Sequence, residues 1–389
     1  MLLKFSVENY SSFRDEATLY FLAAETNDHS SHLVPGPDGD VLPVVALFGA
    51  HGSGKTNVLH GLMTMAGKVL SPEITLYLNP YSLENEYMFS PIFLEVALFL
   101  GEGEEAKEYN YGFKMMQRGT VVEEWLYIGS NDDKWKMQRI FERNASTGKY
   151  KVDNLDASSK ERLESLDISS DRLVLSLEEA QEIPELARVY EWFSNLSFLE
   201  LQGLNSDIQQ ALAHLRECKD DPVEKENLIR FLKGCGLMLE DIVPYSNKDF
   251  TIVYADNKHI DATLESAAFY KLVNLYFAMK KCFETGGLLF VDDLDLHPLV
   301  IRNLIITFAN QEVNSNHAQL VFSTQNIWFL SGDVLRDDEI CFVEKGEDYA
   351  SELYSLADFK KTAKREDCIR EYLLGRYGAI PQLEKLFGR

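Results

Sequence analysis

The segment that most constrains the fold is a glycine-rich octapeptide, Gly49-Ala50-His51-Gly52-Ser53-Gly54-Lys55-Thr56. It fits the pattern G-x-x-x-x-G-K-[ST] at every fixed position. A continuous apolar run, VLPVVALFGA, leads into it, and NVLHGLMTMAGKVL, with apolar residues at helical spacing, follows it. Such an apolar run is typical of a strand buried on both faces. The order of strand, glycine loop and helix therefore predicts a phosphate-binding loop in an α/β fold.

The eight residues of this loop are of the types that bind nucleotide phosphates. Glycines let backbone N–H groups turn toward a phosphate, because they have no Cβ in the way. Lys55 is expected to reach the β- and γ-phosphates, and the Thr56 hydroxyl to ligate Mg²⁺. The following helix directs its positive end at the same place. We therefore expect ATP and Mg²⁺ as cofactors, bound by Gly49–Thr56.

A second motif, LLFVDDLDLHP, begins at Leu288. Its four apolar residues predict a buried strand with Asp292 at its tip, where a carboxylate would hold Mg²⁺ opposite Thr56. Asp293 follows at the position that usually polarises the attacking water, but it is one methylene shorter than the expected glutamate. A displacement of about an ångström can cost on the order of a hundredfold in rate. Asp293 is thus either a weak catalytic base or an ordinary turn residue.

Two features resemble the ABC-type ATPases of the SMC, RecF and OLD (overcoming lysogenization defect) group. One is Asn57 directly after the G-K-T of the loop, and the other is the opening FSVENYSSF. By this resemblance Asn57 joins the nucleotide-binding residues. The same resemblance makes Asn9, Ser11, Ser12 and Phe13 candidates for base or ribose contacts, with an ordinary strand end as the alternative.

Further segments resemble a bacterial ATP/GTP-binding family that includes RloA-like and abortive-infection ATPases. The stretch Asp295–Pro298 resembles its D-x-x-x-L-H-P segment, although it is shorter here. The other matching stretches, in chain order, are YNYGF, VVEEWLYI, DRLVLSL, VYEWFSN, LYSLADFK and EYLLGRYGAIP. The resemblance covers nearly the whole chain. It implies an α/β P-loop NTPase of the ABC-ATPase type, with a mixed sheet, an antiparallel β lobe and a helical insertion.

Two motifs of that group are altered here. At the place of the ABC signature, LESAAFYKL keeps Ser266 for γ-phosphate binding, but Ala268 brings a Cβ where close backbone approach is needed. At the end of AQLVFSTQN, Gln325 replaces the switch histidine, and an amide can hydrogen-bond to phosphate but cannot take up a proton. A plain helix start and a polar strand end are the alternatives. Together with Asp293, these changes predict slow hydrolysis.

The periodicity divides the chain into three parts. Residues 1–156 alternate like strands and form an N-terminal ATPase lobe with the phosphate loop. Residues 157–245 are mostly helical by period and form an insertion. Residues 246–389 form a C-terminal ATPase lobe that ends in a basic helix, where Tyr372, Arg376 and Tyr377 are expected to make a basic-aromatic contact surface.

Charge and composition limit the kinds of binding partner and the cellular compartment that we expect for this chain. The formal net charge is −24, so most of the surface would repel a nucleic-acid backbone, and direct nucleic-acid binding stays open only for a local groove. No apolar run is long enough to span a membrane, and the start of the chain lacks the features of a signal peptide. The five cysteines are isolated, which suits core positions in a reducing cytoplasm. His29 and His32 lie close together but lack acidic or cysteine partners, so a metal site is not expected.

The family resemblance implies a homodimer or higher oligomer and a setting in prokaryotic anti-phage defence. There the ATPase works with a separately encoded effector protein, a toxin or a nuclease. We therefore expect an ATP-binding, slowly hydrolysing ABC-type ATPase that acts as a nucleotide-gated sensor or scaffold. The alternatives are a RecF-like DNA-repair ATPase and a nucleotide-binding pseudo-ATPase without turnover.

Overall fold

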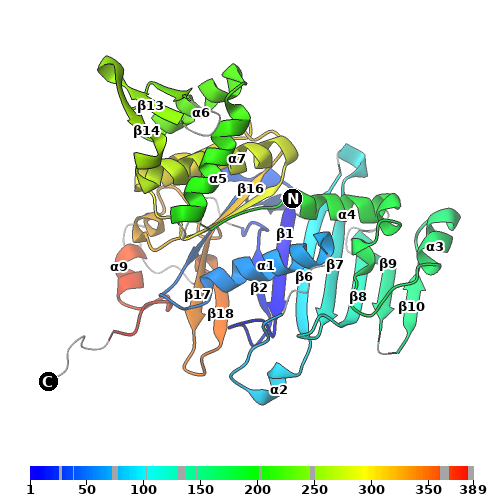
Figure 1. The fold of residues 1–389 in the computed structure, drawn as a ribbon. Helices are drawn as coiled ribbons and strands as arrows, with labels where there is room; N and C mark the ends of the chain where they lie inside the picture. The colour runs from blue at the N-terminus through cyan, green and yellow to red at the C-terminus, as the bar shows by residue number, and fades with distance from the viewer. Residues whose placement is uncertain are drawn as a thin grey trace.

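A computed structural model describes residues 1–25, 29–37, 39–71, 78–101, 103–129, 136–145, 147–200, 204–245, 250–359 and 368–383. Two large sheets dominate it (Figure 1). The antiparallel sheet has the strand order β10-β9-β8-β7-β6-β1-β2. Its strands are β1 (Leu2–Glu8), β2 (Ala17–Tyr20), β6 (Ile92–Leu100), β7 (Lys107–Met115), β8 (Val121–Gly129), β9 (Met137–Asn144) and β10 (Lys149–Val152).

The second sheet is mixed and has the order β11-β15-β16-β5-β17-β18. All its neighbours pair in parallel except β17 and β18. Its strands are β5 (Val44–Phe48), β11 (Ser197–Glu200), β15 (Leu288–Asp292), β16 (Gln319–Ser323), β17 (Ile340–Lys345) and β18 (Ser351–Ser355). Two small sheets comprise β3 (Val34–Pro35) with β4 (Asp40–Val41), and β12 (Asp241–Pro244), β13 (Phe250–Tyr254) and β14 (Lys258–Asp261).

Helices lie on both faces of the mixed sheet and beside the antiparallel sheet. They are α1 (Lys55–Leu70), α2 (Asn85–Met88), α3 (Ala157–Glu164), α4 (Pro184–Ser194), α5 (Leu204–Cys218), α6 (Pro222–Gly234), α7 (Ala267–Thr285), α8 (Pro298–Ala309) and α9 (Cys368–Leu373). In Figure 1, α1 crosses the antiparallel sheet, and α5, α6 and α7 gather at the opposite end of the molecule with β13 and β14.

The mixed sheet lies between two hydrophobic cores, which explains the continuous apolar runs in its strands. In β5, Val45 and Leu47 belong to the core shared with α1 and the antiparallel sheet. Val44, Ala46 and Phe48 belong to the core shared with α5, α7 and α8. Because successive side chains of a strand point to opposite faces, a strand covered on both sides must be apolar at every position.

The structure confirms the predicted fold class, a P-loop NTPase of the ABC-ATPase type with a mixed sheet, an antiparallel β lobe and inserted helices. The range 157–245 also contains β11, a strand that periodicity did not predict, and it pairs with β15. Its helix α4 packs on α1, whereas α5 and α6 pack on α7. The division into two lobes and an insertion stays a prediction.

The end of the chain differs from the predicted basic helix. The helix α9 ends at Leu373, and Gly375 and Gly378 follow with φ of 79° and 64°, which no helix accommodates. Residues 365–367 of the predicted helix lie outside the described residues. Tyr372 and Tyr377 are buried and stack on Phe342 of β17, with ring centroids 5.6 and 6.0 Å apart. The predicted basic-aromatic contact surface is therefore wrong for both tyrosines, since they belong to the core.

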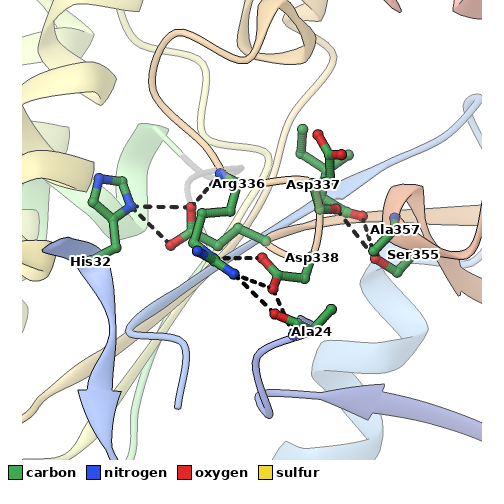
Figure 2. Close-up of polar contacts among 9 residues, drawn as sticks. Ala24, His32, Arg336, Asp337, Asp338, Ser355 and Ala357 are labelled. Atoms are coloured by element: carbon green, nitrogen blue, oxygen red, sulfur yellow. Dashed lines mark hydrogen bonds and ion pairs between the residues drawn. The ribbon is translucent and has the colours of Figure 1, made fainter. Parts of the chain in front are cut away.

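A buried charged cluster fastens the N-terminal segment to the loop before β17 (Figure 2). The guanidinium of Arg336, which is fully buried, donates to both carboxylate oxygens of Asp338 at 2.8 and 2.7 Å. The same carboxylate accepts the Ala24 N–H at 2.8 Å. His32 contacts Glu339, with Nδ1 3.1 Å from Oε1. The sequence view that His32 lacks an acidic partner is thus wrong, because its partner lies 307 residues away.

All five cysteines are free thiols; Cys235 is half-buried and the other four are buried. Within the described ranges, no helix has the length and apolar character that crossing a bilayer requires.

A second buried charge, Glu124 of β8, holds the segment before α4 on the antiparallel sheet. Its carboxylate accepts the N–H groups of Val174 and Leu175 at 2.8 and 3.3 Å and the Tyr111 hydroxyl at 3.0 Å. Arg143 lies 3.9 Å away and donates to the carbonyl of Arg172. Burial raises the pKa of Glu124 to about 7, although these contacts oppose the shift.

This raised pKa predicts a pH dependence of stability. The folded protein keeps a proton on Glu124 that the unfolded chain releases, so this contribution is full below pH 4.5 and is lost as pH rises through about 7. The neutral variant Glu124→Gln removes that dependence. Between pH 4.5 and 8 the free energy of unfolding of the wild type should fall by roughly 3 kcal/mol relative to the variant. Urea unfolding of both proteins across this range measures the difference; parallel pH profiles would contradict the assignment.

Candidate functional site

The phosphate loop lies at the edge of the mixed sheet where the parallel strands end. Register pairs Leu47 of β5 with Ser323 of β16, and Phe322 with Val291 of β15, so these three strands end together. Gly49 follows β5, and Asp292 is the last residue of β15. This edge, beyond the carboxyl ends of parallel strands, is where ligands bind in open α/β sheets.

Close packing explains two of the loop glycines. A Cβ on Gly49 would lie 2.2 Å from the Val343 carbonyl oxygen, and one on Gly54 would lie 2.6 Å from the hydroxyl oxygens of Ser12 and Ser351. Both glycines also have positive φ, 153° and 114°. At Gly49 and Gly54, neither the available space nor the backbone conformation would accept another residue type, because a Cβ would collide with atoms that contact the loop.

Lys55 is folded back into the loop. Its Nζ donates to the carbonyl oxygens of Gly49 and Ala50 at 2.8 and 2.9 Å, and the residue is only 9% exposed. Burial lowers the pKa of the Lys55 ammonium, while the carboxylates of Asp293 and Asp292 oppose that shift. A partly desolvated cation on backbone carbonyls is well placed to bind an incoming anion.

A chain of hydrogen bonds connects the loop to the end of β15. The Thr56 hydroxyl donates to Asp292 Oδ2 at 2.8 Å, and Asp292 Oδ1 accepts the Ser323 hydroxyl at 2.6 Å. Asp292 is 2% exposed, and both of its oxygens are oriented by these contacts. Thr56 and Asp292 are thus brought together, as the sequence predicted, in the arrangement that can hold a divalent cation between a hydroxyl and a carboxylate.

Asp293 lies next to this pair but in a different environment. It is exposed and has a left-handed backbone conformation, with φ of 52°. Its N–H donates to the Ser323 hydroxyl oxygen at 2.7 Å, which fixes the turn. Its negative charge opposes the lowering of the Lys55 pKa. The geometry suits a group that could polarise water there.

Gln325 and Ser266, the other two predicted γ-phosphate contacts, lie on separate elements. Gln325 follows β16, and its Nε2 is 3.4 Å from Nδ1 of His51 in the phosphate loop. Ser266 is exposed at the start of α7, where its hydroxyl oxygen accepts the Phe269 N–H at 3.3 Å as an N-cap. The structure therefore places Gln325 beside the phosphate loop, whereas Ser266 caps the N-terminus of α7.

The N-terminal candidates separate into two groups. Asn9 is buried, and its amide binds the carbonyls of Tyr87 and Ser90, so the predicted base or ribose contact is wrong for Asn9. Phe13 is fully buried, and the same prediction is wrong for it. Asn57 donates to the hydroxyl oxygen of Ser12 at 2.7 Å, so both side chains brace the loop from the N-terminal side. For Ser11 the contact stays a prediction.

The residues present fit a bound nucleotide and Mg²⁺. The Ser53 hydroxyl is buried in the loop and has no hydrogen-bond partner in the described structure, which leaves a polar atom to be satisfied. At Gly52, a Cβ would meet nothing within 4 Å, so the tip of the loop is open. Gly49 to Thr56 would hold the phosphates, and Thr56 with Asp292 would hold the metal.

Sequence reasoning missed two residues of this site. Ser323 joins Asp292 to the backbone of Asp293, and its only signal was a hydroxyl at the end of an apolar strand. Ser351 donates to the Ser53 carbonyl at 2.6 Å from the opposite end of the chain. No local pattern marks Ser351, because its partners lie hundreds of residues away.

Three solved SMC structures are similar to the chain. The "SMC head domain from Thermotoga maritima" has a TM-score of 0.41 and 14% identity, and the match covers 91% of this chain and 98% of that one. A SmcHead "bound to the C-winged helix domain of ScpA" has a TM-score of 0.40, 12% identity and coverages of 91% and 97%, and a Pyrococcus furiosus complex of the Smc head with the C-terminal domain of ScpA has 0.39, 12%, and 96% and 99%. A search of curated proteins finds no match.

A family model described as "AAA domain, putative AbiEii toxin, Type IV TA system" matches residues 44–331. That range contains β5, the phosphate loop, Asp292, Asp293 and Gln325. It thus covers every element that meets at this edge of the sheet except the β17–β18 hairpin and the N-terminal loop. The chain belongs to this family of AAA-domain ATPases of the abortive-infection type, as its motifs predicted.

Proposed function

We propose that this chain is an ATP-binding, slowly hydrolysing ABC-type ATPase that acts as a nucleotide-gated sensor or scaffold for a protein effector in anti-phage defence. One observation carries the proposal: the Thr56–Asp292 contact at 2.8 Å is intact and partly buried, whereas Asp293, the group that would activate water, is short and exposed. The groups proposed to bind metal and phosphate are in place, and the groups proposed for hydrolysis are altered.

Binding draws on the loop and its support. Backbone N–H groups of the loop and Lys55 would take the phosphates, and Thr56 with Asp292 would take Mg²⁺. Bound Mg²⁺ would neutralise phosphate charge. Ser323 keeps Asp292 in the rotamer that meets Thr56, because its hydroxyl occupies the other carboxylate oxygen.

Hydrolysis needs a base that reaches the attacking water and a group that stabilises the charge that develops on the γ-phosphate. The Asp293 carboxylate acts on Lys55 through its charge but is one methylene shorter than glutamate, and its backbone is fixed by Ser323. Gln325 stands beside His51 as a neutral donor. Both groups can assist the reaction only weakly, which is the reason for proposing slow turnover.

The description of the family refers to a toxin–antitoxin system, which supports a separately encoded toxin or nuclease as effector. The net charge of −24 favours a partner protein with a basic surface over bulk nucleic acid. We also propose a cytoplasmic location and assembly into a homodimer or higher oligomer. A RecF-like repair ATPase is the alternative; binding of duplex DNA at low salt, weakening as salt rises, would favour it.

The first prediction concerns turnover. Wild-type protein should release phosphate from MgATP at below about 1 per second, the low end of typical enzyme rates. Lys55→Ala should abolish both ATP binding and release, because the loop loses its only side-chain cation. Steady-state phosphate release and equilibrium binding measure these effects, with Lys160→Ala in α3, a lysine that pairs with Glu164, as control. Fast turnover by the wild type would contradict the slow-scaffold proposal.

The second prediction concerns the shortened acid. Asp293→Glu restores the missing methylene and should raise phosphate release about tenfold, since the carboxylate gains roughly an ångström of reach. Asp295→Glu, an exposed acid two residues later, is the matched control and should change little. Tight ATP binding with no release even in Asp293→Glu would instead favour the pseudo-ATPase without turnover.

The third prediction concerns Ser323. Ser323→Ala leaves Asp292 free to rotate away from Thr56, so the Mg²⁺ concentration that half-saturates ATP-dependent thermal stabilisation should rise about fivefold to tenfold. Ser323→Thr keeps the hydroxyl and should stay close to the wild type. Equal Mg²⁺ requirements for the alanine variant and the wild type would exclude this role.

A further inference from the structure

We propose that Ser351, the first residue of β18, is a positioning residue of the phosphate loop, so that the C-terminal hairpin is a working part of the nucleotide site. This inference rests on the proposed nucleotide binding, and it names a residue that sets the affinity of the loop for the nucleotide. Ser351 is 4% exposed and lies 298 residues from Ser53 in sequence. Neither the loop motif nor the match at residues 44–331 includes it.

The Ser351 hydroxyl is the donor in two contacts at this point. Its Oγ lies 2.6 Å from the Ser53 carbonyl oxygen and 2.7 Å from Ser12 Oγ. A hydroxyl has a single proton, and a carbonyl oxygen can only accept. The Ser351 proton is therefore shared between the Ser53 carbonyl oxygen and the Ser12 hydroxyl oxygen. Ser12 in turn accepts from Asn57 at 2.7 Å.

The result is a relay from Asn57 through Ser12 and Ser351 to the Ser53 carbonyl. In it, the Ser12 hydroxyl oxygen accepts from both Asn57 and Ser351, and Ser351 also donates to the Ser53 carbonyl oxygen. The backbone joins the same connection, since the Ser351 N–H donates to the Ser12 carbonyl at 2.7 Å. Three segments that are distant in sequence thus meet at one peptide of the loop.

That peptide is the one between Ser53 and Gly54. A trans peptide is planar, and its C=O and N–H point in opposite directions. Holding the Ser53 carbonyl on the Ser351 side therefore turns the Gly54 N–H away from Ser351. In a phosphate loop, such N–H groups are the ligands of the phosphates. Fixing the carbonyl fixes the orientation of a phosphate ligand.

Ser351 can serve as a fixed point because the hairpin that carries it is held on several sides. β17 pairs with β5, and its Val343 carbonyl packs against Gly49. The loop before β17 is fastened by Arg336 and Asp338 (Figure 2). On the hairpin's other side, Phe342 stacks on Tyr372 and Tyr377. The hairpin therefore gives the loop a rigid neighbour.

Titration of the full chain with MgADP tests the inference. Ser351→Ala should weaken MgADP binding about tenfold, which is about 1.4 kcal/mol, because the loop peptide becomes free to rotate. In turnover, KM for MgATP should rise by a similar factor, while kcat changes less than threefold. Ser12→Ala breaks the relay but keeps the Ser351–Ser53 bond, and should weaken binding twofold to threefold. The double variant should resemble Ser351→Ala alone, since both act through one bond.

Ser176→Ala is the matched control. Ser176 is also buried and donates to a backbone carbonyl, that of Leu173, at 2.7 Å, but it lies beside the antiparallel sheet. It should lose similar thermal stability and keep MgADP affinity within twofold. If Ser351→Ala binds MgADP like the wild type while Lys55→Ala does not bind, the inference is overturned and the proposed function stands. If the wild type fails to bind, both are overturned. Should Ser351→Ala not fold, unchanged affinity in Ser12→Ala overturns the inference.

Discussion

The constraint on which the structure depends is the burial of the parallel strands on both faces. β5, β15, β16 and β17 place alternate side chains in two different cores, so their central residues are apolar. Polar residues follow where the strands stop, because only there does the backbone leave the apolar layers. The phosphate loop, Asp292, Ser323 and Gln325 all come at or just after strand ends, and shared register brings them to one edge.

At that edge, the phosphate loop and the metal pair are held by more contacts with the rest of the protein than the γ-phosphate side is. The phosphate loop and the metal pair are held by buried and partly buried contacts: Lys55 on loop carbonyls, Thr56 on Asp292, and Asn57 and Ser351 on Ser12. The γ-phosphate side has exposed groups, with Asp293 held by its backbone and Gln325 3.4 Å from His51. This difference in packing is the physical basis for separating nucleotide binding from hydrolysis in the proposed function.

Much of the fold could be predicted because hydrophobic period and glycine position are local signals. The buried strand β5, the helix α1 after the phosphate loop and the strand β15 that ends at Asp292 were predicted from them. β11 was not, since its four residues follow a helix and are too few to show a period. Tyr372 and Tyr377 were wrongly predicted to lie on a contact surface, because tyrosines near basic residues occur both on such surfaces and in cores. Only their stacking on Phe342 shows that they belong to the core.

The sequence by itself determined the chemistry of the loop, since each group of G-x-x-x-x-G-K-[ST] acts within a few residues of its neighbours. It also determined that Asp292 would meet Thr56, because each residue comes at or after the end of a buried parallel strand, and the ends of such strands lie at the same edge of the sheet. Only the tertiary structure decided how these groups are held. Ser323 on Asp292, Ser351 on Ser53 and Glu339 on His32 are contacts between distant segments. A hydroxyl or carboxylate carries no local mark of a distant partner, and only the folded arrangement of strands selects it.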